Sequence, residues 1–162
     1  MMGLSAAKMD SQQVEIVGRA QLTIHLAQDG IEIARPERDN GIDLVCYLNC
    51  GGTFLSAPLQ IKVTRVPTFS VWKKYSRIPS LLMIYVWLDA EMPTILAMTQ
   101  EEATDLVSEF GWDNTNSWMK EGHYRATTSK TQRERLEDFR VNPGDWIAIL
   151  KRASAPQSSL EK

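Results

Sequence analysis

The fold prediction for this chain rests on two neighbouring segments, 39-DNGIDLVCYL-48 and 59-LQIKVTRV-66, which a glycine-rich turn separates. In the second segment apolar and polar residues alternate, so that Gln60 and Lys62 share the polar face. A period of two is typical of a β-strand with one buried face. In the first segment a turn leads into a strand, and Asp43 lies near the start of that strand. We therefore expect Asp43 to lie beside Gln60 and Lys62 on an adjacent strand.

Periodicities elsewhere in the chain predict a mixed order of helices and strands. Residues 81–88 (LLMIYVWL) are apolar on both faces, which is typical of a strand in the interior of a sheet. A capping box at Thr99 and Glu102 begins a helix that ends at about Phe110. The other expected elements are a helix over 12–29, strands over 31–33, 94–98 and 124–127, a loop over 112–124, a charged helix over 129–139, and a strand or a helix over 146–150. This order predicts an α/β fold with a mixed central β-sheet flanked by helices.

The composition is that of a globular domain. Apolar residues make up 43% and charged residues 23% of the 162 positions, which excludes disorder of the whole chain. This length suits one domain, which we place at residues 12–152, between a flexible N-terminus over 1–11 and a disordered tail over 153–162. The formal net charge of −2 does not fit a protein that coats nucleic acid or anionic membranes, although it allows a local basic patch.

Two cysteines and the absence of long apolar runs bear on localisation. Cys46 and Cys50 are four residues apart, which along a strand is roughly 13 Å, too far for a disulfide without a turn. We expect two reduced thiols. No signal peptide is visible, and the most apolar run is far below the roughly 20 residues of a membrane helix. We expect a cytoplasmic protein that does not enter a membrane.

The expected meeting of Asp43, Gln60 and Lys62 suits the cleavage of a phosphodiester. A carboxylate and other oxygen donors hold a divalent cation such as Mg²⁺ or Mn²⁺, which polarises a phosphate and lowers the pKa of a bound water. A lysine holds or activates that water, or stabilises developing negative charge. The alternative is that Gln60 and Lys62 lie on a solvated strand face, which is common in proteins.

The N-terminal helix, the 39-DNGIDL-44 segment, the glycine turn and the 60-QIK-62 segment together resemble the PD-(D/E)XK, or restriction-endonuclease-like, nuclease superfamily. The similarity is greatest to small bacterial proteins with a Q-x-K motif, and it covers roughly residues 12–88. The resemblance implies that Asp43 is the first metal-binding acid, that Gln60 stands at the second metal-binding position and that Lys62 is the catalytic lysine. It also implies a Mg²⁺- or Mn²⁺-dependent endonuclease that acts on DNA.

The resemblance further implies a glutamate on the first helix. Glu15 is our candidate, with Gln12 and Gln21 as rivals. Gln60 departs from the acid that the superfamily usually has there, and a neutral amide binds cations less strongly than a carboxylate does. Asp39 could be a second acid of the site, but in an Asp-Asn-Gly turn an Asp more often has a structural role, which we expect here.

A basic and aromatic segment follows the second strand directly. Its cations are Arg65, Lys73, Lys74 and Arg77, and its aromatic residues are Phe69, Trp72 and Tyr75. Such a segment suits contact with a nucleic-acid backbone, although a solvated loop fits as well. Tryptophans 72, 112 and 118 lie in expected loops, where they either stack on bases or pack locally, while Trp87 and Trp146 are expected in the core.

Two functions follow from these features. The first is a metal-dependent nuclease acting on DNA, for which Asp43 and Lys62 argue. The second is a nuclease-like fold without catalysis that serves as a nucleic-acid or protein binding or regulatory module, for which Gln60 and the acidic net charge argue. The sequence leaves open whether the chain is an enzyme, and whether it forms a homodimer or binds a protein partner.

Overall fold

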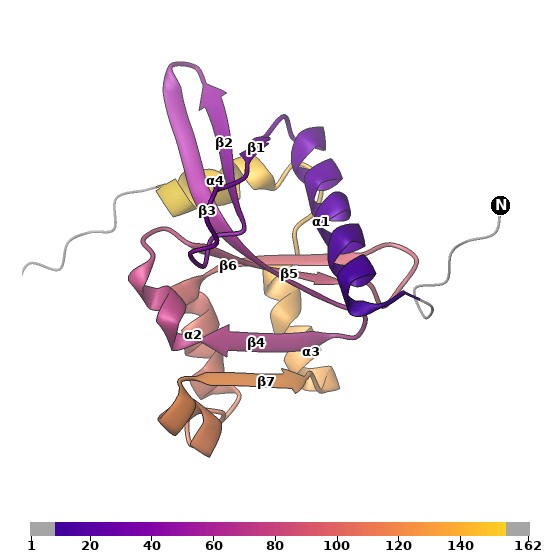
Figure 1. The fold of residues 1–162 in the computed structure, drawn as a ribbon, viewed down its shortest axis with the longest axis vertical. Helices are drawn as coiled ribbons and strands as arrows, with labels where there is room; N and C mark the ends of the chain where they lie inside the picture. The colour runs from indigo at the N-terminus through magenta and orange to yellow at the C-terminus, as the bar shows by residue number, and fades with distance from the viewer. Residues whose placement is uncertain (1–8, 155–162) are drawn as a thin grey trace, which may run out of the picture.

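The computed structural model describes residues 9–154, and Figure 1 shows the arrangement of their elements. The predicted flexible N-terminus and disordered tail fall mainly on residues 1–8 and 155–162, which lie outside the described residues. Where the predicted ends do overlap the described range, Ser11 is already helical and residues 153–154 still are. No helix of the described range combines the length and the apolar character that crossing a membrane requires.

A five-stranded sheet forms the centre of the domain, with strand order β1-β2-β3-β5-β6. Only the β3–β5 pair is parallel, so the sheet is mixed and mostly antiparallel, as the sequence predicts. A separate antiparallel ribbon pairs β4 with β7. The strands are β1 (Glu32–Ala34), β2 (Leu44–Cys50), β3 (Thr53–Thr64), β4 (Thr68–Trp72), β5 (Leu82–Trp87), β6 (Thr94–Thr99) and β7 (His123–Thr127).

Helices cover both faces of the sheet (Figure 1). On one face α1 (Ser11–Gln28) and α4 (Trp146–Ser154) pack on the strands through a common apolar core. On the other face α2 (Gln100–Glu109), α3 (Lys130–Leu136) and the β4–β7 ribbon share a second core with the sheet. Short helical turns complete the fold: 3-10 turns at η2 (Lys73–Arg77) and η4 (Glu137–Phe139), and a π-helical turn at η3 (Ser117–Glu121).

The strand β5 is buried along its whole length, which confirms the prediction for residues 81–88. Alternate side chains of β5 belong to the two cores. Ile84 and the residues two positions before and after it pack in the core with α1 and α4. Tyr85 and the residues two positions before and after it pack in the core with α2 and the ribbon. The predicted capping box also forms, because Thr99 accepts from the backbone of Glu102 and Glu102 accepts from that of Thr99.

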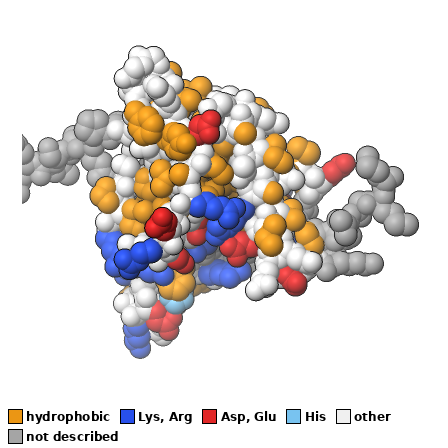
Figure 2. All heavy atoms as spheres, turned by 45° about the horizontal axis from the view of Figure 1, so that its top comes forward, with side chains coloured by type: hydrophobic (Ala, Val, Ile, Leu, Met, Phe, Trp, Pro, Cys, Tyr) orange, Lys and Arg blue, Asp and Glu red, His pale blue; other side chains and the backbone are white. Residues whose placement is uncertain are grey.

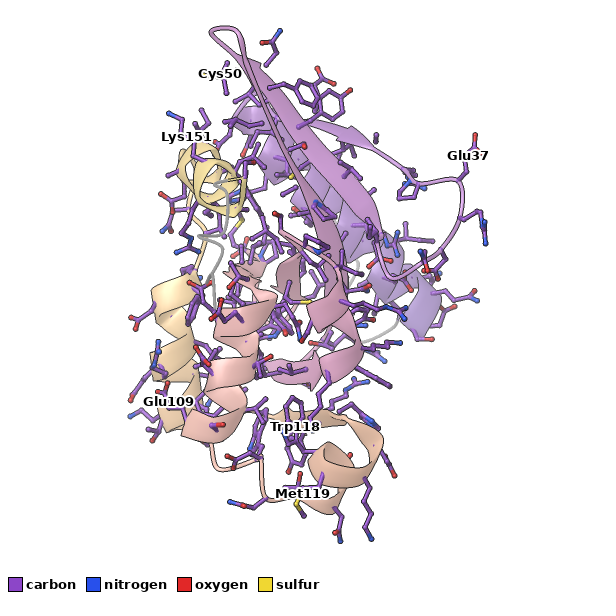
Figure 3. The ribbon with its side chains drawn as sticks, turned by 90° about the vertical axis from the view of Figure 1, so that its left-hand side faces the viewer. Glu37, Cys50, Glu109, Trp118, Met119 and Lys151 are labelled. Atoms are coloured by element: carbon purple, nitrogen blue, oxygen red, sulfur yellow. The ribbon has the colours of Figure 1, made fainter. Side chains whose placement is uncertain are left out.

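The β2–β3 hairpin extends beyond the body of the domain (Figures 1 and 3). Its register pairs Leu44 with Leu59, and Cys50 with Thr53 at the tip. Figure 3 shows Cys50 near this tip, and both Cys46 and Cys50 are free thiols, as expected. The register also brings Asp43, one residue before β2, opposite Gln60.

The segment between β3 and β5 differs from the expected loop. Residues 68–72 form β4 because their partner β7 lies far along the chain, with Phe69 opposite Ala126. Two buried donors of β5 fix this strand, since the Tyr85 hydroxyl donates to the Ser70 carbonyl at 2.7 Å and the Trp87 indole to the Thr68 carbonyl at 2.9 Å. These long-range contacts have no local sequence signal.

The expected loop over 112–124 contains the π-helical turn η3. Trp112 is 7% and Trp118 is 6% exposed, so both pack on the domain, as one of the two alternatives predicts. Figure 3 shows Trp118 pointing toward the domain and Met119 pointing away from it. Trp87 and Trp146 lie in the core, as predicted, and residues 146–150 belong to a helix, α4.

Candidate active site

The Asp-Asn-Gly turn before β2 sets the position of Asp43. The Asp39 carboxylate accepts from the Gly41 backbone at 3.2 Å, which is the structural role expected for Asp39. Gly41 has a φ of +82°, and a side chain there would meet Tyr75 and Ile78 at 3.3 Å. The Asp43 backbone then donates to the Leu59 carbonyl at 2.8 Å, which continues the β2–β3 pairing by one residue.

Three donors surround the Asp43 carboxylate, whose side chain is only 15% exposed. Oδ2 accepts from the Gln60 amide nitrogen and from the Ile61 backbone, both at 2.7 Å. Oδ1 accepts from Nη2 of Arg19 at 3.2 Å. The predicted meeting of Asp43 with Gln60 is therefore present, and Gln60 is itself buried.

The helix α1 approaches β3 closely at Gly18. A Cβ atom at this position would lie 2.2 Å from Cγ1 of Val63, so a residue larger than glycine does not fit. The next residue, Arg19, forms an ion pair with Glu15, with Nη2 2.8 Å from Oε1. The same nitrogen donates to Oδ1 of Asp43 at 3.2 Å. The helix thereby adds one acid and one cation to the site.

Lys62 lies on the same face of β3 as Gln60 and is half-buried. Its Nζ donates to the Tyr75 hydroxyl at 3.4 Å and lies 5.5 Å from the centre of that ring. Burial lowers the pKa of Lys62 below its ordinary value of 10.5, and the nearby charge of Asp43 opposes this shift. Burial also raises the pKa of Tyr75, with Asp43 acting in the same direction.

These side chains line one cavity of about 380 Å³. Glu15 is the one of the three helix candidates that lines it; Gln12 and Gln21 line other cavities of the described part of the chain. A larger cavity of 670 Å³ runs along the outer side of α1 and shares Glu15 and Arg19, but its walls are mostly apolar. The smaller cavity is lined by Ser11, Glu15, Arg19, Asp43, Gln60, Ile61, Lys62, Val63, Thr64, Thr68, Ser70 and Arg125.

Among the described residues, none of the four predicted nucleic-acid contacts lines the cavity. Of these four, Lys74 is the one whose positive charge lowers the pKa of Lys62. Its Nζ atom lies 4.6 Å from the ring centre of Trp72. Lys73 lies 4.7 Å from the ring centre of Trp118. Arg65 donates to the Met9 carbonyl at 2.9 Å, and Arg77 is exposed at the end of η2.

The sequence analysis missed two cations of the site, Arg19 and Arg125. Arg125 lines the cavity from β7, because the ribbon pairs it with Ser70 of β4, and it also lowers the pKa of Lys62. No local pattern in the sequence indicates that pairing. Arg19 follows Glu15 by four residues on the predicted helix, a spacing typical of an ion pair, and this spacing was the signal in the sequence for Arg19. Figure 2 shows Lys and Arg side chains gathered in the lower half of the face that it presents, with acidic side chains between them.

The donor set of the cavity fits a divalent cation of the Mg²⁺ or Mn²⁺ kind. Two carboxylates, from Glu15 and Asp43, converge on one cationic nitrogen of Arg19, so the geometry already accommodates a positive charge between them. The amide oxygen of Gln60 is a further hard donor on the same face. Within residues 9–154 no group of three or more His, Cys, Asp and Glu side chains comes together to hold a metal ion, so this cavity has two acids and one amide oxygen as its donors.

Comparisons with known proteins bear on the fold. No protein-family model and no curated protein matches this chain. Among solved structures it is similar to a bacterial homing endonuclease, I-Ssp6803I, with a TM-score of 0.51 and 15% identity over 90% of this chain and 95% of that one. This likeness shows a nuclease-like α/β fold, in agreement with the fold class that the sequence predicts. At such low identity the chemistry must be argued from the site itself.

Proposed function

We propose that this protein is a metal-dependent phosphodiesterase of the PD-(D/E)XK type that cleaves DNA. The observation that carries the proposal is the convergence of Glu15, Asp43, Gln60 and Lys62 on one cavity from α1, the turn before β2, and β3. A random solvated strand face would not bring a helix acid to the same cavity. The name of the similar structure, a homing endonuclease, supports a nucleic-acid substrate.

In this proposal Glu15, Asp43 and Gln60 hold a Mg²⁺ or Mn²⁺ ion. When bound, such an ion polarises the scissile phosphate and lowers the pKa of a water ligand. The Ile61 backbone and the 15% exposure of Asp43 keep that carboxylate in one orientation, which limits the reorganisation needed to bind a cation. Gln60 contributes its oxygen after its amide group turns, because its nitrogen now faces Asp43.

Lys62 acts on the reacting phosphate in this proposal. Its ammonium group lies on the same strand face as Gln60, and Tyr75 restrains it through the 3.4 Å hydrogen bond. An ammonium held there stabilises the negative charge that grows on the phosphate in the transition state. Arg125 and Lys74, which lie near it, attract the DNA backbone toward the same cavity.

A catalytically inactive binding module is the second candidate. One observation favours it: the Asp43 carboxylate already has three donors, from Arg19, Gln60 and Ile61, and is satisfied without a metal ion. In that case the same cations around the cavity would bind nucleic acid without cleaving it.

The test is a cleavage assay on plasmid and linear duplex DNA with Mg²⁺, with Mn²⁺ and with EDTA. We expect cleavage only with a divalent ion. Asp43→Ala should abolish it through loss of the ion, and Lys62→Ala should lower the rate roughly 10²- to 10³-fold while sparing ion binding. The matched controls are Asp113→Ala, in the segment after α2, and Lys130→Ala, exposed on α3; both should cleave as the wild type does.

The outcomes separate the two candidates. Metal-dependent cleavage that Asp43→Ala removes supports the nuclease. DNA binding with no cleavage under any of these conditions supports the binding module instead. Cleavage that survives both Asp43→Ala and Lys62→Ala would mean that a contaminating nuclease or another site is responsible.

A further inference from the structure

The least expected feature of the site is Arg19. Its Nη2 atom lies 2.8 Å from Oε1 of Glu15 in an ion pair and donates to Oδ1 of Asp43 at 3.2 Å. One cationic nitrogen therefore bridges the two carboxylates of the cavity. These are the two acids that the proposed function assigns to the metal ion.

We propose that Arg19 is an internal competitor of the divalent cation: its guanidinium holds the cation's place in the metal-free protein and must leave before the ion binds. The inference rests on the proposed function, since it concerns the same two acids. It goes beyond that function by assigning to Arg19 control of the metal affinity of the site.

The backbone of α1 holds Arg19 in place. Because Gly18 lies in tight contact with Val63, the helix cannot shift away from β3 without losing that packing. The Arg19 side chain is 27% exposed, so it is partly removed from water but has a route toward solvent. The competitor is thus anchored at its backbone and mobile only through its side chain.

One hydrogen-bond donor of the Arg19 side chain is unpaired within the described part of the chain, which agrees with a guanidinium that leaves the two acids when a cation binds. Its Nε atom is buried and has no hydrogen-bond partner among the described residues. A buried donor without a partner carries a cost of desolvation. Displacement toward solvent would expose this donor to water, which lowers the cost of leaving the two acids.

Electrostatic repulsion prevents the Arg19 guanidinium and a divalent cation from binding the two acids at the same time. A dication and a guanidinium that share the same two oxygens would lie within a few Å of each other, where their repulsion in a partly buried site is large. Lys62, Lys74 and Arg125 already supply positive charge around the cavity. The site therefore accepts one cation between Glu15 and Asp43, either the guanidinium or the metal ion.

Isothermal titration of the EDTA-treated, dialysed full chain with MnCl₂ tests this exclusion. Arg19→Met removes the charge and keeps much of the side-chain length. We expect its dissociation constant for Mn²⁺ to be roughly tenfold lower than that of the wild type. The control is Arg133→Met, exposed on α3, which changes the net charge equally and should leave the constant unchanged.

Each outcome decides between the ideas. Tighter binding by Arg19→Met alone, including binding where the wild type has none, supports the inference. Equal or weaker binding by Arg19→Met than by the wild type overturns it and leaves the proposed function standing. Tightening by Arg133→Met to the same extent also overturns it, because net charge would then suffice. If no variant binds Mn²⁺, both the inference and the metal-dependent function fail.

A measurement on the wild type guards against misfolding of the variant. Addition of Mg²⁺ to ¹⁵N-labelled protein should shift the side-chain Nε–H resonance of Arg19 and leave that of Arg133 in place. If Mg²⁺ binds and the Arg19 resonance does not move, the guanidinium is not displaced and the inference is wrong.

Discussion

At the scale of single residues, Asp43 is the centre of the site and Gln60 is its closest side-chain partner. Gln60 is a donor in the metal-free protein, because its amide nitrogen lies 2.7 Å from Oδ2 of Asp43. An acid at this position could not donate unless it were protonated. Under the proposed function, the glutamine would therefore stabilise the metal-free site at the expense of affinity for a cation.

The Gln60→Glu variant tests whether this residue raises the stability of the metal-free site and lowers its affinity for a cation. Two carboxylates in place of a charge-assisted hydrogen bond should destabilise the metal-free protein by about 1–3 kcal/mol. With Mn²⁺ the second full negative charge should raise metal affinity and restore stability. Thermal unfolding in EDTA and in MnCl₂ measures both effects. Gln60→Met is the control, since it loses the same hydrogen bond and gains no charge, and it should show no rescue by Mn²⁺. A Gln60→Glu protein that Mn²⁺ does not stabilise would contradict the role given to this position.

At the scale of elements, the site depends on the packing of α1 against β3. Gly18 permits that contact, because the space for its Cβ is taken by the Val63 side chain. Glu15 and Arg19 lie on either side of Gly18 in α1. A change in the distance between α1 and β3 therefore moves both residues relative to Asp43.

Gly18→Ala should therefore destabilise the protein, although alanine has the higher helix propensity. Overpacking of this kind costs about 1–3 kcal/mol in the free energy of unfolding. Val63→Ala in the same chain should relieve most of the clash, so the double variant should be more stable than the sum of the single changes predicts. Urea unfolding of the three variants measures this coupling. Additive effects would mean that the helix and the strand do not make the close contact described.

At the scale of the whole molecule, the charges are unevenly distributed. The chain has a net charge of −2, yet Lys62, Lys74 and Arg125 surround the candidate site. Local positive potential of this kind attracts a polyanion irrespective of the total charge.

The proposed DNA binding should accordingly weaken steeply as salt is added. Lys74→Gln and Arg125→Gln should each reduce the slope of log affinity against log salt by about 1, because each removes one phosphate contact. Fluorescence anisotropy with a labelled duplex, in EDTA, measures the slope without cleavage. Lys130→Gln, exposed on α3, is the control and should leave the slope unchanged. Equal slopes for all four proteins would place the DNA elsewhere on the surface.

The sequence by itself determined the fold class, the interior strand β5 and the meeting of Asp43 with Gln60 and Lys62. These depend on local patterns: a period of two, a turn with glycines, and one hairpin whose register pairs Leu44 with Leu59. Only the tertiary structure showed that Glu15 lines the cavity while Gln12 and Gln21 line others, and only it brought Arg19 and Arg125 to the cavity. The physical reason is that the placement of α1 on β3 and the pairing of β4 with β7 depend on contacts between residues far apart in the chain. Helix and strand periodicities carry no information about such contacts.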